Sequence, residues 1–109
     1  MSDIDSIINK IIKFRDDRNW KQFHNTKDLA LGLFIETGEL NEQFLWKDKE
    51  HVDVKKLKEE LADVFIFALL LSEKHNIDIK KIILDKIKEN KEKYPVQKAK
   101  NSAKKYNEL

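Results

Sequence analysis

The chain has 109 residues, of which 39% are charged and 40% belong to the hydrophobic set, a balance that excludes an intrinsically disordered chain. It has no cysteine, which excludes disulfides, thiolate metal sites and thiol nucleophiles and suits the cytoplasm, where we expect the protein to act. The formal net charge of +2 gives no reason to expect nucleic acid as a partner, and no uncharged run is long enough for a membrane segment.

Apolar residues at helical spacing predict four helices, over residues 2–17, 26–45, 54–74 and 79–93. Thr26 and Asp78 are the predicted N-caps of the second and fourth helices, and Pro95 ends the fourth. We predict a polar loop at WKDKEHVD and a loop or short final helix in the tail to Leu109.

Two glycines and one proline leave little material for turns, so long helices with few connections are favoured. Four such helices predict an all-α, antiparallel four-helix bundle that forms a single domain over residues 1–109. The second and third helices contain LALGLFI and VFIFALLL and are apolar on several sides. A helix of this kind needs burial on more than one side, so we expect a homo-oligomer.

Two of the predicted helices place a pair of carboxylates against apolar neighbours. In the second helix, Glu36 falls inside the apolar stripe and Glu39 lies one turn further on. In the third helix, Glu60 and Asp63 share a face with Phe67. Burying four ionised carboxylates together is costly, because each loses its hydration and repels the others.

We expect no lysine on either acidic face, so a hard divalent cation is the natural compensation, and Mg²⁺ prefers oxygen ligands. Glu-x-x-His motifs are absent, which disfavours a di-iron centre. One ExxE pair alone is usually a solvated surface in a chain with 20 acidic residues. The alternative function is a non-enzymatic helical interaction module, since residues 86–109 carry eight lysines and three glutamates.

Four segments in order, RDDRNWKQFH, LALGLFIETGELNEQFLW, EELADVFIFALLL and KIKENKEKYPVQKAKNSAKKY, resemble the MazG-like all-α nucleoside triphosphate pyrophosphohydrolases. Within that family they are most similar to the dCTP pyrophosphatase branch. The resemblance covers nearly the whole chain, and its core is ExxE followed by ExxD. Enzymes that hydrolyse phosphoribosyl-ATP share the fold type, but the aromatic and C-terminal segments fit the nucleotide-pool branch better.

The resemblance implies an enzyme that cleaves a (deoxy)nucleoside triphosphate to the monophosphate and pyrophosphate in nucleotide-pool house-cleaning. It implies that Glu36, Glu39, Glu60 and Asp63 bind Mg²⁺, for which Mn²⁺ can substitute, and that Glu36 or Glu39 activates the attacking water. It also implies a homotetramer built as a dimer of dimers. No glycine-rich GxxxxGK loop is present, so metal and cationic side chains must hold the phosphates.

The resemblance further implies a set of substrate-binding residues for a small-molecule nucleotide. Aromatic and histidine side chains would surround the base, where stacking contributes about 1–3 kcal/mol, and the C-terminal residues would hold the phosphates. Phe67 stands where close relatives carry a tyrosine, so we expect a dCTP-like or modified pyrimidine rather than dCTP alone. The set comprises Trp20, His24, Trp46, Phe67, Lys86, Asn90, Lys93, Tyr94, Lys105 and Tyr106.

Overall fold

The computed structural model describes residues 2–109, which form helices and, over this range, no strand. The all-α class predicted from the sequence is therefore confirmed. No helix within these residues is long and apolar enough to cross a membrane. The α-helices are α1 (Asp3–Asp17), α2 (Thr26–Glu42), α3 (Val54–Lys74), α4 (Ile79–Lys93) and α5 (Val96–Ala99), and the 3-10 helices are η1 (Lys21–Phe23) and η2 (Tyr106–Glu108).

Side-chain caps define where the long helices begin. Ser2 and Asp5 form a reciprocal capping box at the start of α1, one residue after the predicted boundary. Asp53 and Asp78 accept hydrogen bonds from the backbone N–H groups of the first turns of α3 and α4, so the predicted cap at Asp78 is confirmed. Pro95 follows the end of α4, as predicted, and the tail beyond it contains the short helices α5 and η2.

The second helix begins at Thr26 as predicted, but its predicted N-cap and its predicted C-terminal end need correction. The N-cap of α2 is Asn25 and not Thr26, because the Asn25 side chain accepts the Asp28 N–H at 2.8 Å. The Thr26 hydroxyl instead pairs with Nε2 of His75, just beyond α3, at 2.8 Å. At the other end, α2 stops at Glu42 rather than residue 45, since the chain tightens into turns that end in a left-handed conformation at Trp46.

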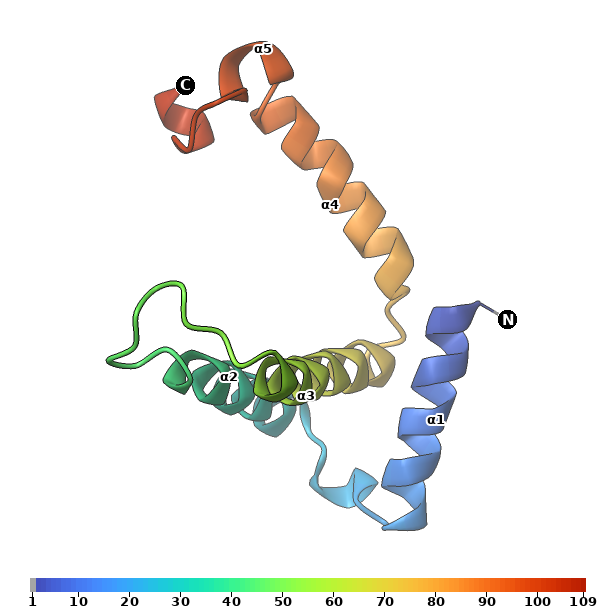
Figure 1. Ribbon diagram of the computed structural model, residues 1–109. Coiled ribbons are helices and arrows are strands. Elements are labelled where there is room, and N and C mark those ends of the chain that lie inside the picture. The colour runs from blue at the N-terminus through green and yellow to red at the C-terminus, as the bar shows by residue number, and fades with distance from the viewer. Residues whose placement is uncertain (1) are drawn as a thin grey trace. The chain divides into compact units, whose positions relative to one another are not determined.

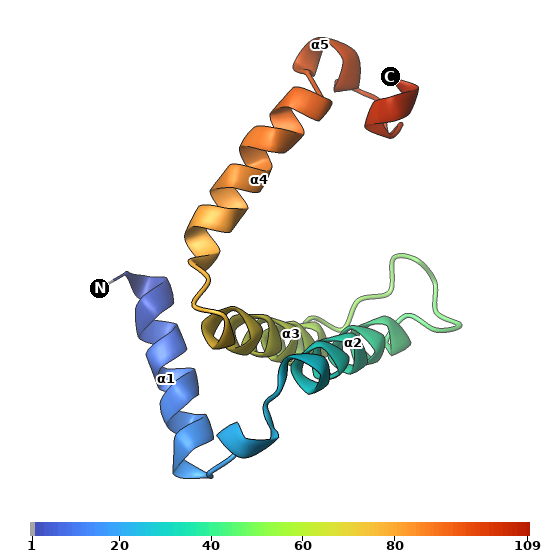
Figure 2. The ribbon, with the colours of Figure 1, turned by 180° about the vertical axis from the view of Figure 1, so that it is seen from behind.

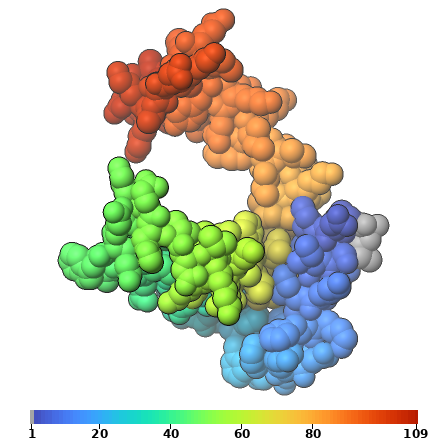
Figure 3. Space-filling model, in the orientation of Figure 1, coloured from blue at the N-terminus to red at the C-terminus, as the bar shows by residue number. Residues whose placement is uncertain are grey.

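The chain divides into two compact units, Met1–Ile77 and Asp78–Leu109. In the first unit, α2 and α3 lie side by side and run antiparallel, and α1 contacts α3 (Figures 1 and 2). The connection between α2 and α3, drawn in green, projects from the end of this helix pair in the space-filling view (Figure 3). The fourth predicted helix, α4, belongs to the second unit, so its place in a four-helix bundle stays a prediction.

The core of the first unit is small. Leu29 of α2 and Leu70 of α3 are the fully buried hydrophobic side chains among residues 2–109, at 2% and 6% exposed. Arg15 of α1 is also buried, and its guanidinium donates to Asp16 Oδ1 at 2.9 Å and to Glu73 Oε2 at 3.1 Å. The second bond joins α1 to the end of α3, and it explains how a charged group is tolerated in this contact.

Gly32 allows α2 and α3 to approach closely. A Cβ atom built at Gly32 would lie 2.8 Å from Cδ1 of Phe67 and closer still to another atom of the same ring. The aromatic ring therefore occupies the space that any other residue at position 32 would fill. Gly38, further along α2, has nothing within 4 Å of the equivalent position.

Gly32→Ala should lower the free energy of unfolding by about 1–3 kcal/mol, because the added methyl group collides with the packed Phe67 ring. The matched control is Gly38→Ala in the same helix, which should raise the free energy of unfolding by about 0.5–1 kcal/mol through better helix propensity. Urea unfolding followed by circular dichroism measures both values. Two alanine variants of equal stability would contradict the close approach at Gly32.

Candidate functional site

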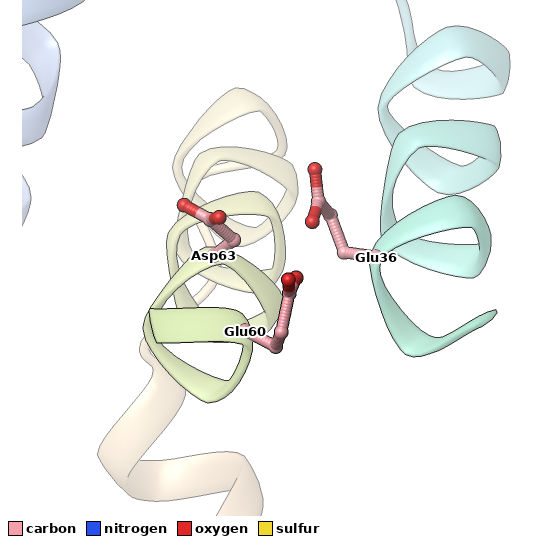
Figure 4. Close-up of side chains that lie close together, drawn as sticks. All are labelled: Glu36, Glu60 and Asp63. Atoms are coloured by element: carbon pink, nitrogen blue, oxygen red, sulfur yellow. The ribbon is translucent and has the colours of Figure 1, made fainter. Parts of the chain in front are cut away.

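The predicted carboxylate pairs face each other across α2 and α3. Glu36 of α2 and Glu60 and Asp63 of α3 each offer one oxygen atom, and these three atoms lie within 4.8 Å of one another. Figure 4 shows the Glu36 carboxylate reaching from α2 toward the two carboxylates of α3. The i, i+3 spacing on α3 places Glu60 and Asp63 on one face, and the antiparallel packing of α2 brings Glu36 to it.

Two oxygens of this cluster lack any partner. Oε2 of Glu36 and Oε2 of Glu60 are buried and make no hydrogen bond. Burial raises the pKa of the Glu36 carboxyl, and the neighbouring charge of Glu39 and then that of Asp63 raise it further. Burial and the charge of Glu39 also raise the pKa of Glu60. Both shifts have the physical cause expected for acidic groups that are crowded and partly removed from water.

Glu39, the fourth predicted ligand, is exposed and lies outside the group of three, although its charge acts on both Glu36 and Glu60. The expectation that no lysine shares the acidic face was wrong. Lys56 lies one turn before Glu60 on α3, and its charge lowers the pKa of Glu60 against the larger raising effects. Lys56 precedes Glu60 by four residues in the sequence, and this spacing could have indicated that the two side chains share a face of α3.

The cluster fits a hard divalent cation. Its donors are carboxylate oxygens, which Mg²⁺ and Mn²⁺ both accept. A bound cation would supply the missing partners of the two buried Oε2 atoms and remove the repulsion among the acidic groups. The donor set contains no histidine or thiolate that would favour a softer metal.

A pocket of about 240 Å³ adjoins the acidic cluster, because Asp63 forms part of its wall. Three of the residues predicted to bind the base, Trp20, His24 and Phe67, line this pocket together with Asp63. These residues come from α3 and from the segment between α1 and α2, so only the fold brings them together. The remaining lining residues are Ile11, Phe14, Arg15, Ile66 and Leu70.

The Trp20 ring of this pocket packs against α1. The Trp20 ring meets the Phe14 ring edge to face at 5.8 Å, and the Arg18 guanidinium lies 3.6 Å from the Phe14 centroid. Nδ1 of His24 is buried and has no hydrogen-bond partner. Burial, followed by the nearby charge of Arg15, lowers the pKa of His24, which favours the neutral ring and leaves Nδ1 able to bond to a ligand group.

Trp46, also predicted at the base, lies elsewhere. Its side chain is 94% exposed, and its backbone adopts the left-handed conformation with φ of 60°. It is not among the residues lining the pocket that contains Trp20. In this chain the structure therefore separates the two tryptophans.

The predicted phosphate-binding residues lie in the second unit. Nζ of Lys86 and Nζ of Lys93 each lie 3.2 Å from a carboxylate oxygen of Glu89, a residue that sequence reasoning did not single out. Lys93 Nζ is also 5.0 Å from the Tyr106 ring centroid, and the Tyr106 ring meets that of Tyr94 edge to face. Asn90 and Lys105, the other two residues predicted to bind phosphate, are exposed.

The sequence matches a known protein family. The model of the MazG-like family matches residues 33–109. Over 105 residues the chain is 34% identical to dCTP pyrophosphatase 1 of Rattus norvegicus and 35% identical to that of Homo sapiens. In both cases the match covers 89% of this chain but 62% of the relative, so the chain spans less than two thirds of these curated relatives.

A solved structure agrees with the family match. A pyrophosphatase from Archaeoglobus fulgidus superposes with a TM-score of 0.82 at 29% sequence identity. That match covers 87% of this chain and 94% of the archaeal one. Since the family model spans well over half of the sequence, the chain belongs to the MazG-like family.

Proposed function

We propose that this protein is a Mg²⁺-dependent nucleoside triphosphate pyrophosphohydrolase that releases a nucleoside monophosphate and pyrophosphate. The observation that carries this proposal is the cluster of Glu36, Glu60 and Asp63, with two unpartnered oxygens, beside an aromatic pocket. The names of the dCTP pyrophosphatases and of the archaeal pyrophosphatase support the same reaction class. A metal site next to a base-sized pocket is what hydrolysis of a nucleotide anhydride requires.

Glu36, Glu60 and Asp63 would hold the cation directly. Bound Mg²⁺ would neutralise phosphate charge and make a coordinated water more acidic. Either Glu36 or Glu39 would orient the attacking water and take its proton, as the water oxygen bonds to the α phosphorus and pyrophosphate leaves from it. Glu39 suits this role because it lies beside the three carboxylates without belonging to their group.

The pocket beside Asp63 would receive the base. Trp20 offers an aromatic face, Phe67 closes the wall, and neutral His24 offers a ring nitrogen for a hydrogen bond. Relatives named for dCTP favour a dCTP-like or modified pyrimidine as the substrate. The lysines and tyrosines of the second unit would add to phosphate binding, since Lys86 and Lys93 could each exchange Glu89 for a phosphate oxygen.

We further propose that the protein acts in the cytoplasm as a homotetramer, a dimer of dimers. Large apolar side chains remain exposed on α2, among them Phe34 at 75% and Ile35 at 57%, and they need a covering surface. Trp46, which is exposed in this chain, would complete the base pocket of a neighbouring copy. The single functional domain over residues 1–109 would then clear surplus or modified nucleotides from the pool.

The reaction is tested by incubating the protein with canonical and modified nucleoside triphosphates, with and without Mg²⁺, and separating pyrophosphate from orthophosphate. We expect Mg²⁺-dependent release of pyrophosphate and monophosphate. Glu36→Gln and Glu60→Gln should each lower kcat by on the order of 10²-fold or more. Glu59→Gln, which changes the exposed neighbour of Glu60, is the control and should retain activity. A folded protein without turnover on any nucleotide would refute the proposed function.

The pH dependence of stability tests the metal site separately. Because the pKa of Glu36 is raised above 4.5, the folded metal-free protein keeps a proton that the unfolded chain releases. This contribution to the free energy of unfolding should therefore fall as pH rises from about 4.5 through the raised pKa. Glu36→Gln should remove that part of the slope, and Mg²⁺ should restore stability in the wild type near neutral pH.

The pH dependence of stability is measured by urea unfolding at several pH values, first with a chelator and then with Mg²⁺. Glu59→Gln again serves as the control, and it should keep the pH slope of the wild type. A Glu36→Gln variant with an unchanged slope, or a wild type insensitive to Mg²⁺, would argue against a crowded metal-binding carboxylate at this position.

Trp20→Ala tests the base pocket. Loss of stacking worth about 1–3 kcal/mol should raise KM by about tenfold, with a smaller effect on kcat. Phe23→Ala removes a nearby exposed aromatic ring that does not line the pocket, and it should leave KM unchanged. Steady-state kinetics on the preferred nucleotide gives both constants, and equal KM values for wild type and Trp20→Ala would place the base elsewhere.

A further inference from the structure

Besides the aromatic pocket, the first unit has a polar pocket at the end of the α2–α3 pair where the connecting loop lies. It has a volume of about 220 Å³ and lies where α2 ends, the connecting loop passes and α3 begins. Its residues have no role in the proposed reaction. Its lining residues are Glu42, Gln43, Lys47, His51, Asp53 and Lys56.

This pocket contains both a hydrogen-bond acceptor and hydrogen-bond donors that have no partner. Oε1 of Gln43 is buried without a partner, while its Nε2 donates to the Lys56 carbonyl at 3.4 Å. Within residues 2–109, the ammonium groups of Lys47 and Lys56 form no ion pair and no hydrogen bond. Asp53 is already engaged, because it accepts the Lys56 backbone N–H at 3.2 Å. The two ammonium groups can bind an anion, and the Gln43 oxygen can accept a hydrogen bond from a proton or a water molecule that the anion carries.

The position of Lys56 relates this pocket to the acidic cluster. Phe67, Asp63, Glu60 and Lys56 follow each other at intervals of three or four residues on α3, so they share one face, about one 5.4 Å turn apart. Phe67 lines the aromatic pocket, Asp63 and Glu60 form the cluster, and Lys56 lines the polar pocket. A nucleoside triphosphate has the same order of parts: the base, the phosphate that is attacked, and the two phosphates that leave.

The lysines of the second unit are less available than Lys56. Lys86 and Lys93 both pair with Glu89, and a phosphate must displace this carboxylate to reach them. Lys56 and Lys47 need no such exchange. The carboxylates of Glu42 and Asp53 in the same wall suit an anion that carries its own cation, as pyrophosphate does in the presence of Mg²⁺.

We propose that Lys56, with Lys47 beside it, forms a subsite for the departing pyrophosphate part of the substrate. This inference rests on the proposed function and adds a residue on α3 to the recognition of phosphate. Lys56 contacts the β and γ phosphates while the α phosphate lies at the carboxylate cluster. Product release then requires pyrophosphate to leave this pocket.

The test is the affinity of the full-length protein for inorganic pyrophosphate, measured by calorimetry with Mg²⁺ present and without any nucleotide. Lys56→Met should weaken pyrophosphate binding by about tenfold or more, since a charge-assisted contact is lost. Lys56→Arg should restore most of the affinity. Lys58→Met removes an exposed lysine of the same helix that does not line the pocket, and it should bind like the wild type. Circular dichroism verifies that each variant is folded.

The affinity for a nucleoside monophosphate shows whether Lys56→Met removes only the pyrophosphate subsite or damages the whole substrate site. Lys56→Met should leave monophosphate affinity unchanged while weakening pyrophosphate. Unchanged pyrophosphate affinity in Lys56→Met, or a loss seen only in Lys93→Met, would overturn the proposal and place the pyrophosphate on the second unit. A wild type that binds no pyrophosphate would overturn it too. If pyrophosphate binding depends on Lys56 but no nucleotide is hydrolysed, the subsite stands and the proposed function fails.

Discussion

The close packing of α2 on α3 is the constraint from which the site follows. Gly32 leaves room for the Phe67 ring, so the two helices approach closely enough for Glu36 to meet Glu60 and Asp63. The approach removes water from two carboxylate oxygens without supplying a hydrogen-bond donor. The resulting rise in the pKa of Glu36 and Glu60 is the electrostatic cost of this arrangement. In the proposed function, a cation bound at the cluster would relieve that cost and so would stabilise the helix pair.

The chemistry is distributed along one face of α3. Phe67 of the aromatic pocket, Asp63 and Glu60 of the carboxylate cluster, and Lys56 of the polar pocket follow each other over about three turns of α3. A rigid helix fixes the spacing of these parts better than a loop would, which matters for a reaction that depends on positioning. α1 completes the aromatic pocket through Phe14 and Arg15, and the ion pair of Arg15 with Glu73 ties it to α3.

The described chain leaves much apolar surface uncovered. Its two fully buried hydrophobic side chains contrast with large exposed ones such as Phe34 and Trp46. Folded monomers seldom expose so many large apolar groups, so their distribution over α2 and the loop after it agrees with an assembly of several copies. The second unit has few buried groups of its own, and its ion pairs, such as Lys81 with Asp85, are exposed and contribute little to stability. In the proposed homotetramer, association would cover these exposed apolar side chains.

The sequence by itself determined the helices and the two acidic pairs, because periodicity and cap residues act over a few neighbouring positions. It could not distinguish Asn25 from Thr26 as a cap, since both residues favour that role and the backbone conformation selects one. Only the tertiary structure decided that Trp20 and His24 share a pocket with Asp63, and that Lys56 lines a second pocket together with residues from the end of α2 and the loop after it. The reason is physical: spacing tells which residues share one face of a helix, whereas the packing of α1, α2 and α3 decides what that face meets.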